Sequence, residues 1–294
     1  MIDIHTHVPT HRDVVPPGEE VVNAKWRPDR AVSATTTWAE YERAFAEVDV
    51  SVAFTIARDR ERVPAGLNDD VAAFVAAAPR RRIGFLSVHP EVAGVDDELE
   101  RAAGDLGLKG IKLGPNYQIF DPLGDAALRL YGFAESRGLP ILFHQGASPV
   151  REAPLRYAHP LLMDEVAIRF PELRIVMAHM GHPWWRETIV TIRKHPHVYA
   201  DVSALFYRPW SLYEGMRLVA EWNVFDKLLF GSDYPIATPA ETAAGLRRVN
   251  EPIGGTGLPA VPLGAIEEII ERDPLPLLGL ERPSWTGQSP TAPF

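Results

Sequence analysis

Two histidines separated by one residue stand near the start of the chain, in the segment Ile2-Asp3-Ile4-His5-Thr6-His7. The apolar residues before them predict a buried strand, and side chains two apart on a strand point to the same face. Both imidazoles would then be presented together at the end of a core element, as in metal sites built from neutral histidine nitrogens. In a chain with ten histidines this motif is weak by itself. Its meaning depends on whether further ligands follow other strands.

Other side chains with acid–base or metal-binding chemistry follow later predicted strands. In chain order, these positions are occupied by His89, Lys112, His144, His179 and Asp233. A single histidine is more often a core or surface residue than a ligand. A random distribution would not place five of ten histidines at strand ends, so the set as a whole indicates one shared site.

The elements that would carry these residues alternate along the whole chain. Short β-branched or apolar runs predict strands at 2–7, 50–57, 82–88, 110–113, 140–144, 174–179, 198–202 and 227–232. Amphipathic stretches predict helices at 38–48, 68–78, 96–106, 125–137, 159–170, 184–194, 212–222 and 238–249. Strands separated by helices imply parallel βαβ units, and eight of these favour a (β/α)8 barrel, whose catalytic groups sit at the carboxyl ends of the strands. An open doubly wound sheet is the alternative, but no Gly-x-Gly-x-x-Gly follows the first strand.

A single barrel domain is predicted over residues 1–280, followed by a loosely packed tail at 281–294. No internal repeat or linker divides the chain. The segment 8–37 is a long loop between a strand and a helix, of the kind that usually carries function. Residues 251–294 are rich in proline and glycine around one short predicted helix at 264–272, so this segment is expected to lie outside the barrel.

Composition narrows the class of protein. An apolar content of 46% and a charged content of 23% are ordinary for a globular chain, and a net charge of −9 argues against a nucleic-acid surface. The chain has no cysteine, which excludes disulfides, thiolate ligands and a cysteine nucleophile. No apolar run approaches the length of a membrane span. We therefore expect a cytoplasmic enzyme with nitrogen and oxygen ligands, which acts on a small molecule and binds neither nucleic acid nor membrane.

Five segments of the chain resemble the amidohydrolase superfamily, specifically the amidohydrolase-related branch that includes 2-amino-3-carboxymuconate-6-semialdehyde decarboxylase and related hydratases, lactonases and hydrolases. The segments are Ile2-Asp3-Ile4-His5-Thr6-His7, Gly110-Ile111-Lys112-Leu113-Gly114-Pro115, Phe143-His144-Gln145-Gly146, Ala178-His179-Met180-Gly181 and Phe230-Gly231-Ser232-Asp233-Tyr234-Pro235. The resemblance covers nearly the whole chain and implies a distorted (β/α)8 barrel. It also implies one divalent metal ion beside His179, with ligands His5, His7, His144 and Asp233. Homodimers are common in this branch.

The ligand set alone does not fix the reaction, and hydrolysis is the reaction that we expect first, because no arginine of the chain stands in a context that matches the decarboxylases. Three imidazoles and one carboxylate suit Zn²⁺, and would also accept Mn²⁺, Fe²⁺ or Co²⁺. Such an ion lowers the pKa of bound water from about 15.7 to about 7. Asp233 would orient or deprotonate this water, while His179 would donate to a developing oxyanion or protonate a leaving group. The expected substrate is a small ester, lactone or amide.

The role of Lys112 has two interpretations. In binuclear members of the superfamily, a carboxylated lysine from the fourth strand bridges two metals, and His144 and His179 would then hold the second ion. The segment around Lys112 resembles the mononuclear branch instead, in which this lysine faces the substrate or balances charge inside the barrel. We therefore expect one metal ion.

Decarboxylation of a small aromatic or enoic acid is the alternative reaction. It would need a fixed cation near the departing carboxylate, which Arg12, Arg27 or Arg58 could supply. The residues expected to contact the substrate are Lys112, Arg58, His89, Tyr207 and Arg208. Of these, Arg58, Tyr207 and Arg208 are candidates for recognising an anionic group, and His89 has a structural role as an equal alternative. A metal-free barrel that serves as a binding protein is an alternative of another class. It would be marked by a missing ligand, and the sequence lacks none of the four.

Overall fold

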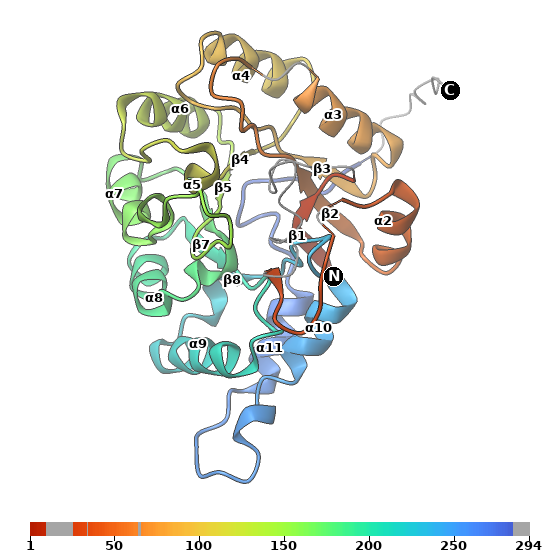
Figure 1. The fold of residues 1–294 in the computed structure, drawn as a ribbon, viewed down its shortest axis with the longest axis vertical. Helices are drawn as coiled ribbons and strands as arrows, with labels where there is room; N and C mark the ends of the chain where they lie inside the picture. The colour runs from red at the N-terminus through yellow and green to blue at the C-terminus, as the bar shows by residue number, and fades with distance from the viewer. Residues whose placement is uncertain (10–25, 34, 64–65, 285–294) are drawn as a thin grey trace.

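The computed structural model describes residues 1–9, 26–33, 35–63 and 66–284. Within these ranges the strands pair in parallel and follow one another in chain order (Figure 1). They are β1 (Ile2–His7), β2 (Val50–Phe54), β3 (Arg82–Gly84), β4 (Ile111–Leu113), β5 (Ile141–Phe143), β6 (Ile175–Met177), β7 (Val198–Asp201) and β8 (Leu228–Leu229). One sheet has the order β1-β2-β3 and the other the order β4-β5-β6-β7-β8. All eight predicted strands are found, most of them shorter than the apolar runs that predicted them.

The two sheets meet at two seams. A single parallel bridge joins Leu86, after β3, to Ile111, and another joins Thr6 to Tyr234, after β8. The strands therefore surround one interior, and the predicted (β/α)8 barrel is confirmed, with its distortion at the two seams. Sequential strand order excludes the doubly wound alternative, in which the order reverses at a switch point.

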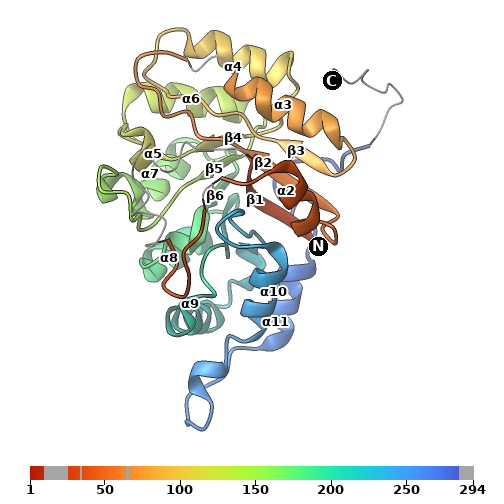
Figure 2. The ribbon, with the colours of Figure 1, turned by 45° about the vertical axis from the view of Figure 1, so that its right-hand side comes forward.

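The helices lie around the outside of the strands (Figures 1 and 2). They are α2 (Trp38–Ala44), α3 (Leu67–Ala77), α4 (Val95–Gly104), α5 (Pro115–Gln118), α6 (Asp125–Ser136), α7 (Leu161–Arg169), α8 (Trp185–Lys194), α9 (Pro209–Trp222), α10 (Pro239–Arg247) and α11 (Leu263–Glu271). Each predicted helix is present, and α5 is an addition directly after β4. Thr37 and Thr238 form capping boxes with Glu40 and Glu241, which fix where α2 and α10 begin. None of the described helices has the length and apolar character needed to cross a membrane.

The barrel interior is closed at the amino ends of the strands by residues that follow α11. Leu275 and Leu278 belong to the same buried apolar cluster as Ile2 and Ile83, which begin or lie within β1 and β3. Both leucines are 1% exposed. The expectation that residues 251–294 lie outside the barrel is therefore wrong for this stretch, because the open amino end of a barrel needs an apolar cover. The tail predicted at 281–294 lies mostly outside the described residues.

A bulge in β1 determines where its two histidines point. Asp3 pairs with Ser51 and Thr6 with Ala53, so three steps along β1 match two steps along β2. The extra residue reverses the alternation of faces. Without it, regular alternation from Ile2 and Ile4 would turn Thr6 inward. With it, the Thr6 hydroxyl lies outside the barrel, 3.0 Å from the Tyr41 hydroxyl of α2.

Asp3 holds this bulge in place. Its Oδ1 accepts hydrogen bonds from the backbone N–H groups of His5 (3.0 Å) and Ser232 (3.1 Å), and so ties β1 to the segment after β8. The His5 ring consequently packs inside the barrel against Phe54, with the ring centroids 5.2 Å apart. The strand that carries the histidines is thus shaped by a buried carboxylate two residues earlier.

Candidate metal centre

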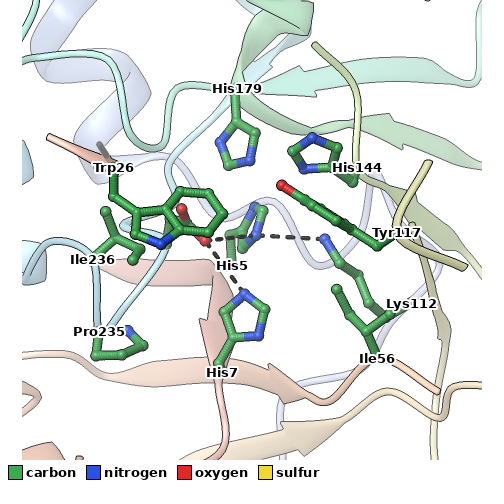
Figure 3. A pocket seen from close by; sticks show the side chains of 11 residues that line it. His5, His7, Trp26, Ile56, Lys112, Tyr117, His144, His179, Pro235 and Ile236 are labelled. Carbon is green, nitrogen blue, oxygen red and sulfur yellow. Dashed lines mark hydrogen bonds and ion pairs between the residues drawn. The ribbon is translucent and has the colours of Figure 1, made fainter. Parts of the chain in front are cut away.

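A pocket at the carboxyl ends of the strands contains six of the predicted site residues (Figure 3). The space between its lining side chains, counted together with the adjoining open solvent, is about 420 Å³. The described residues that line it are His5, His7, Trp26, Ile56, Lys112, Tyr117, His144, His179, Asp233, Pro235 and Ile236. Residues from the two sheets, far apart in sequence, therefore meet at one point.

Asp233 lies between the two histidines of β1. Its Oδ1 is 3.2 Å from the Nε2 atom of His5 and 3.3 Å from the Nε2 atom of His7. Its backbone N–H donates to the carbonyl of His5 (2.9 Å), which fixes the left-handed conformation at Asp233 (φ 63°). Burial opposes ionisation, but the close approach of the His5 and His7 imidazoles holds the pKa of Asp233 well below its usual value. These three residues place ligand atoms within 4.8 Å of one another.

His144 follows β5 and supplies a further nitrogen. Its Nε2 is buried and has no hydrogen-bond partner among the described residues. The ring lies 4.5 Å from that of Tyr117 and 5.1 Å from that of His179, measured between centroids. Burial lowers the pKa of His144 well below its usual value, so the imidazole is neutral. An unpartnered buried imidazole nitrogen in the lining of the same pocket as a carboxylate fits a divalent cation, so the donor set present suits the metal that the sequence predicts.

Lys112 lies inside the site on β4. Its side chain is 1% exposed, and its Nζ is 3.5 Å from His5 Nε2 and 4.6 Å from the centre of the Phe54 ring. Burial lowers the pKa of Lys112 to about 7. The amine therefore faces the same space as the histidines.

His179 follows β6 in a short 3₁₀ turn (Ala178–Gly181) and has a left-handed backbone (φ 57°). Its backbone N–H donates to Asp201 Oδ1 (2.9 Å), and its Nδ1 is 2.8 Å from the Ser203 hydroxyl. The ring lies 5.0 Å from that of His5. Burial lowers the pKa of His179 to about 4, so a neutral imidazole lines the pocket.

Four of the predicted substrate contacts are absent from the described lining of this pocket: Arg58, His89, Tyr207 and Arg208. His89 is buried, and its Nε2 lies 2.7 Å from the backbone carbonyl of Gln118 at the end of α5. This contact gives His89 a structural role in holding α5. Arg58 is half-buried on the loop after β2.

Tyr207 and Arg208 support the wall of the pocket from behind. Tyr207 packs in one apolar cluster with Trp26, and Arg208 donates to the backbone carbonyl of Trp26 (3.3 Å). Arg27 is also buried, with its guanidinium 2.6 Å from Asp29 and 4.8 Å from the Tyr207 ring. These side chains position the Trp26 segment. Arg12 lies outside the described residues.

The sequence analysis missed residues on both sides of the pocket. Trp26 comes from the long loop after β1 and Tyr117 from the unpredicted helix α5. Neither residue lies in a sequence pattern that marks a site, because the conformation of the loop or of the short helix brings it to the pocket. Asp201, the last residue of β7, was also missed, although a carboxylate at a strand end in a barrel could have been found by the rule used for Asp233.

The fold and this histidine–carboxylate centre define a metal-dependent enzyme of the amidohydrolase type. The amidohydrolase family model matches residues 2–256. The chain therefore belongs to this family, as its five sequence segments predicted.

Solved structures with the same fold include proteins of different activity. An uncharacterised TIM-barrel protein from Bordetella bronchiseptica is 20% identical, with a TM-score of 0.69 over 95% of this chain and 99% of that chain. A dihydroxybenzoic acid decarboxylase from a Polaromonas species, solved with manganese and 2-nitroresorcinol, is 16% identical, with a TM-score of 0.65 over 95% and 96%. A probable 2-pyrone-4,6-dicarboxylic acid hydrolase from Acinetobacter baumannii, solved with citric acid, is 15% identical, with a TM-score of 0.61 over 95% and 99%. At these identities the likeness shows the fold alone.

Proposed function

We propose that this protein is a metal-dependent hydrolase that cleaves a small ester, lactone or amide. The supporting observation is the position of Asp233, whose Oδ1 lies 3.2 and 3.3 Å from the Nε2 atoms of the two β1 histidines inside the pocket. The proposed ligands of one ion are His5, His7, His144 and Asp233. Zn²⁺ is the first candidate, and Mn²⁺, Fe²⁺ or Co²⁺ would accept the same donors. When bound, the ion would supply a Lewis acid that polarises a substrate oxygen and makes water acidic enough to react.

Asp233 and His179 are the two groups of this proposal that act on the attacking water. Attack of water on a carbonyl carbon requires that one proton leave the water and one proton reach the departing oxygen or nitrogen. Asp233 is ionised and can orient the water, while the neutral His179 ring lies across the pocket from β1. One pocket therefore holds both a carboxylate that can orient the water and an imidazole that can carry its proton.

The walls of the pocket indicate the kind of substrate. Trp26, Ile56, Tyr117 and Ile236 present apolar or aromatic surface. The indole N–H of Trp26 is buried and has no acceptor among the described residues, and Lys112 is the one lysine or arginine in the described lining. The pocket therefore suits a small, partly unsaturated molecule with a carbonyl or anionic oxygen for these donors.

Decarboxylation is the second candidate, because two aromatic side chains, Trp26 and Tyr117, line the pocket. Such walls suit a flat aromatic acid as well as a lactone. However, no arginine is present in the described lining, and Asp29 already engages the guanidinium of Arg27. Hydrolysis, which needs no fixed cation for a departing carboxylate, accordingly comes first.

A product assay distinguishes the two reactions. The full-length protein is analysed for metal content, supplied with Zn²⁺ or Mn²⁺, and given a panel of lactones, esters, amides and hydroxybenzoates. We expect acid release without carbon dioxide, and loss of this activity in Asp233→Asn. Carbon dioxide release would replace the hydrolase with a decarboxylase. Absence of bound metal, together with no thermal shift on adding either ion, would overturn both candidates.

A further inference from the structure

A buried carboxylate joins the two histidines that flank the pocket. Asp201 is fully buried at the end of β7. Its Oδ2 is 2.8 Å from His5 Nδ1, and its Oδ1 accepts from the backbone N–H groups of His179 (2.9 Å) and Ser203 (3.0 Å). The Ser203 hydroxyl also contacts Oδ1. Asp201 thus receives hydrogen bonds at both oxygens.

These contacts make Asp201 a positioning residue. A ring nitrogen of His5, a ring nitrogen of His179 and a carboxylate oxygen of Asp201 also lie within 4.8 Å of one another, so the three residues could hold a metal ion. However, the donors named above already occupy both carboxylate oxygens. The group is therefore explained by hydrogen bonds within the protein, and it adds no second ion to the proposed site.

The same contacts determine where the protons lie. An ionised carboxylate only accepts hydrogen bonds, and a serine hydroxyl has one proton to donate. Ser203 must therefore donate to Asp201, which leaves its oxygen as an acceptor toward His179 Nδ1 at 2.8 Å. The backbone carbonyl of Ser203, 3.3 Å from the same nitrogen, is also an acceptor. Both neighbours of His179 Nδ1 require that this nitrogen carry the proton.

We propose that Ser203, oriented by Asp201, fixes His179 as the tautomer protonated at Nδ1, so that its unprotonated Nε2 serves as the proton acceptor of the reaction. This revises the role of donor that the sequence predicted for His179, because a neutral ring with this tautomer has no proton at Nε2 to give. Asp201 fixes His5 by the same rule, since His5 Nδ1 must donate to its Oδ2.

The catalytic consequence rests on the proposed hydrolysis. As the water oxygen bonds to the carbonyl carbon, one water proton moves to His179 Nε2. The same proton then passes to the leaving oxygen or nitrogen as its bond to carbon breaks, which restores the neutral ring. Asp233 remains a carboxylate throughout, and no other reactant is needed.

The tautomer can be measured without substrate. The full-length protein is labelled with ¹⁵N-histidine, and long-range proton–nitrogen spectra distinguish protonated from unprotonated ring nitrogens. The His179 signals are assigned with His179→Asn. We expect a protonated Nδ1 and an unprotonated Nε2 in the metal-free protein. In Ser203→Ala only the longer contact with the backbone carbonyl remains, so we expect a smaller fraction of this tautomer. Protonated Nε2 in the unchanged protein, or an unaltered His179 pattern in Ser203→Ala, would overturn the proposal. Binding of added Zn²⁺ by this Nε2 would overturn its role as acceptor.

Ser87→Ala is the matched control. Ser87 is also a buried serine at a strand end, and its hydroxyl donates to the Lys112 carbonyl (2.8 Å) without contacting a histidine. It should leave the His179 pattern unchanged. In Ser203→Ala we also expect kcat to fall by about 10-fold or more, while metal affinity stays within about twofold because the Asp201–His5 contact remains. If the spectra show the expected tautomer but the protein hydrolyses none of the substrates, the proposed function is wrong while the proposed tautomer of His179 stands.

Discussion

The two ends of the barrel interior are closed by opposite kinds of side chain. At the amino ends, Leu275 and Leu278 cover the interior with apolar surface. At the carboxyl ends, imidazoles, a lysine and two carboxylates are buried together, among them His5 and Asp233. Both regions bury their side chains, yet only the first gains free energy simply from doing so. Buried polar and charged groups cost free energy unless partners compensate them.

This difference indicates that the amino end contributes mainly to the stability of the fold and the carboxyl end mainly to its chemistry. The carboxyl end retains a costly arrangement in which a carboxylate oxygen approaches two imidazole nitrogens, while His144 Nε2 has no partner among the described residues. A bound cation would satisfy all of these groups at once. Substitutions at the amino end should therefore affect the free energy of unfolding, whereas substitutions at the carboxyl end should affect metal binding and turnover.

The largest effect is expected from Asp233→Ala, which removes a carboxylate from the carboxyl end of the barrel interior, here called the polar end. Removal of the only proposed carboxylate ligand should lower metal affinity by more than about 100-fold, beyond the loss typical of an outer partner, and abolish turnover. Metal content per chain and activity are the measurements. Far-UV circular dichroism should stay unchanged, because the contacts of the barrel walls remain. Full metal content in this variant would contradict the assignment of Asp233 as a ligand.

Leu278→Ala instead removes apolar surface from the amino end of the barrel interior, here called the apolar end. Loss of a fully buried leucine should lower the free energy of unfolding by about 2–5 kcal/mol, with metal content per chain unchanged. Urea unfolding measures the first and metal analysis the second. Leu258→Ala is the control, because Leu258 is 46% exposed and its removal should change stability by less than about 0.5 kcal/mol. Equal effects of the two substitutions would show that the residues after α11 do not close the barrel.

The sequence predicts the polar end better than the apolar one. His144, His179 and Asp233 each follow a strand, and parallel strands in a barrel bring their carboxyl ends together whatever the intervening helices do. Leu275 and Leu278 have no comparable signal, because a proline-rich segment after the last helix can cover either end or neither. Trp26 and Tyr117 were missed for a similar reason, since their positions depend on the conformation of a loop and of a four-residue helix.

The bulge in β1 is a feature that the alternation of side chains along a strand does not predict. The rule that residues two apart share a face correctly pairs His5 with His7, but it does not say which face. Continued from Ile2 and Ile4, it would turn both histidines toward the helices. The direction depends on Asp3, whose hydrogen bonds to two backbone N–H groups are visible only once β8 is placed beside β1.

Asp3→Ala tests whether the bulge that Asp3 stabilises positions the two histidines of β1 at the polar end. The N–H groups of His5 and Ser232 would lose their buried acceptor, which should cost about 1–3 kcal/mol of stability and also weaken metal binding. Asp3→Asn keeps an acceptor oxygen at the same place and should retain most of both. Urea unfolding and metal titration of the two variants provide the comparison. Equal losses in Asp3→Ala and Asp3→Asn would indicate that the charge of Asp3, not its acceptor, supports the bulge.

The smallest effect is expected from Trp26→Phe, which changes the pocket wall but neither end of the barrel. The variant keeps an aromatic ring and removes the indole N–H, which has no acceptor among the described residues. If this group binds a substrate oxygen, KM should rise by about 2- to 12-fold, equivalent to a hydrogen bond of about 0.5–1.5 kcal/mol, with metal content and unfolding unchanged. Trp210→Phe is the control, because Trp210 is 56% exposed on α9. An unchanged KM in Trp26→Phe would leave Trp26 as apolar wall only, and substrate selection would then fall to Lys112 and the metal.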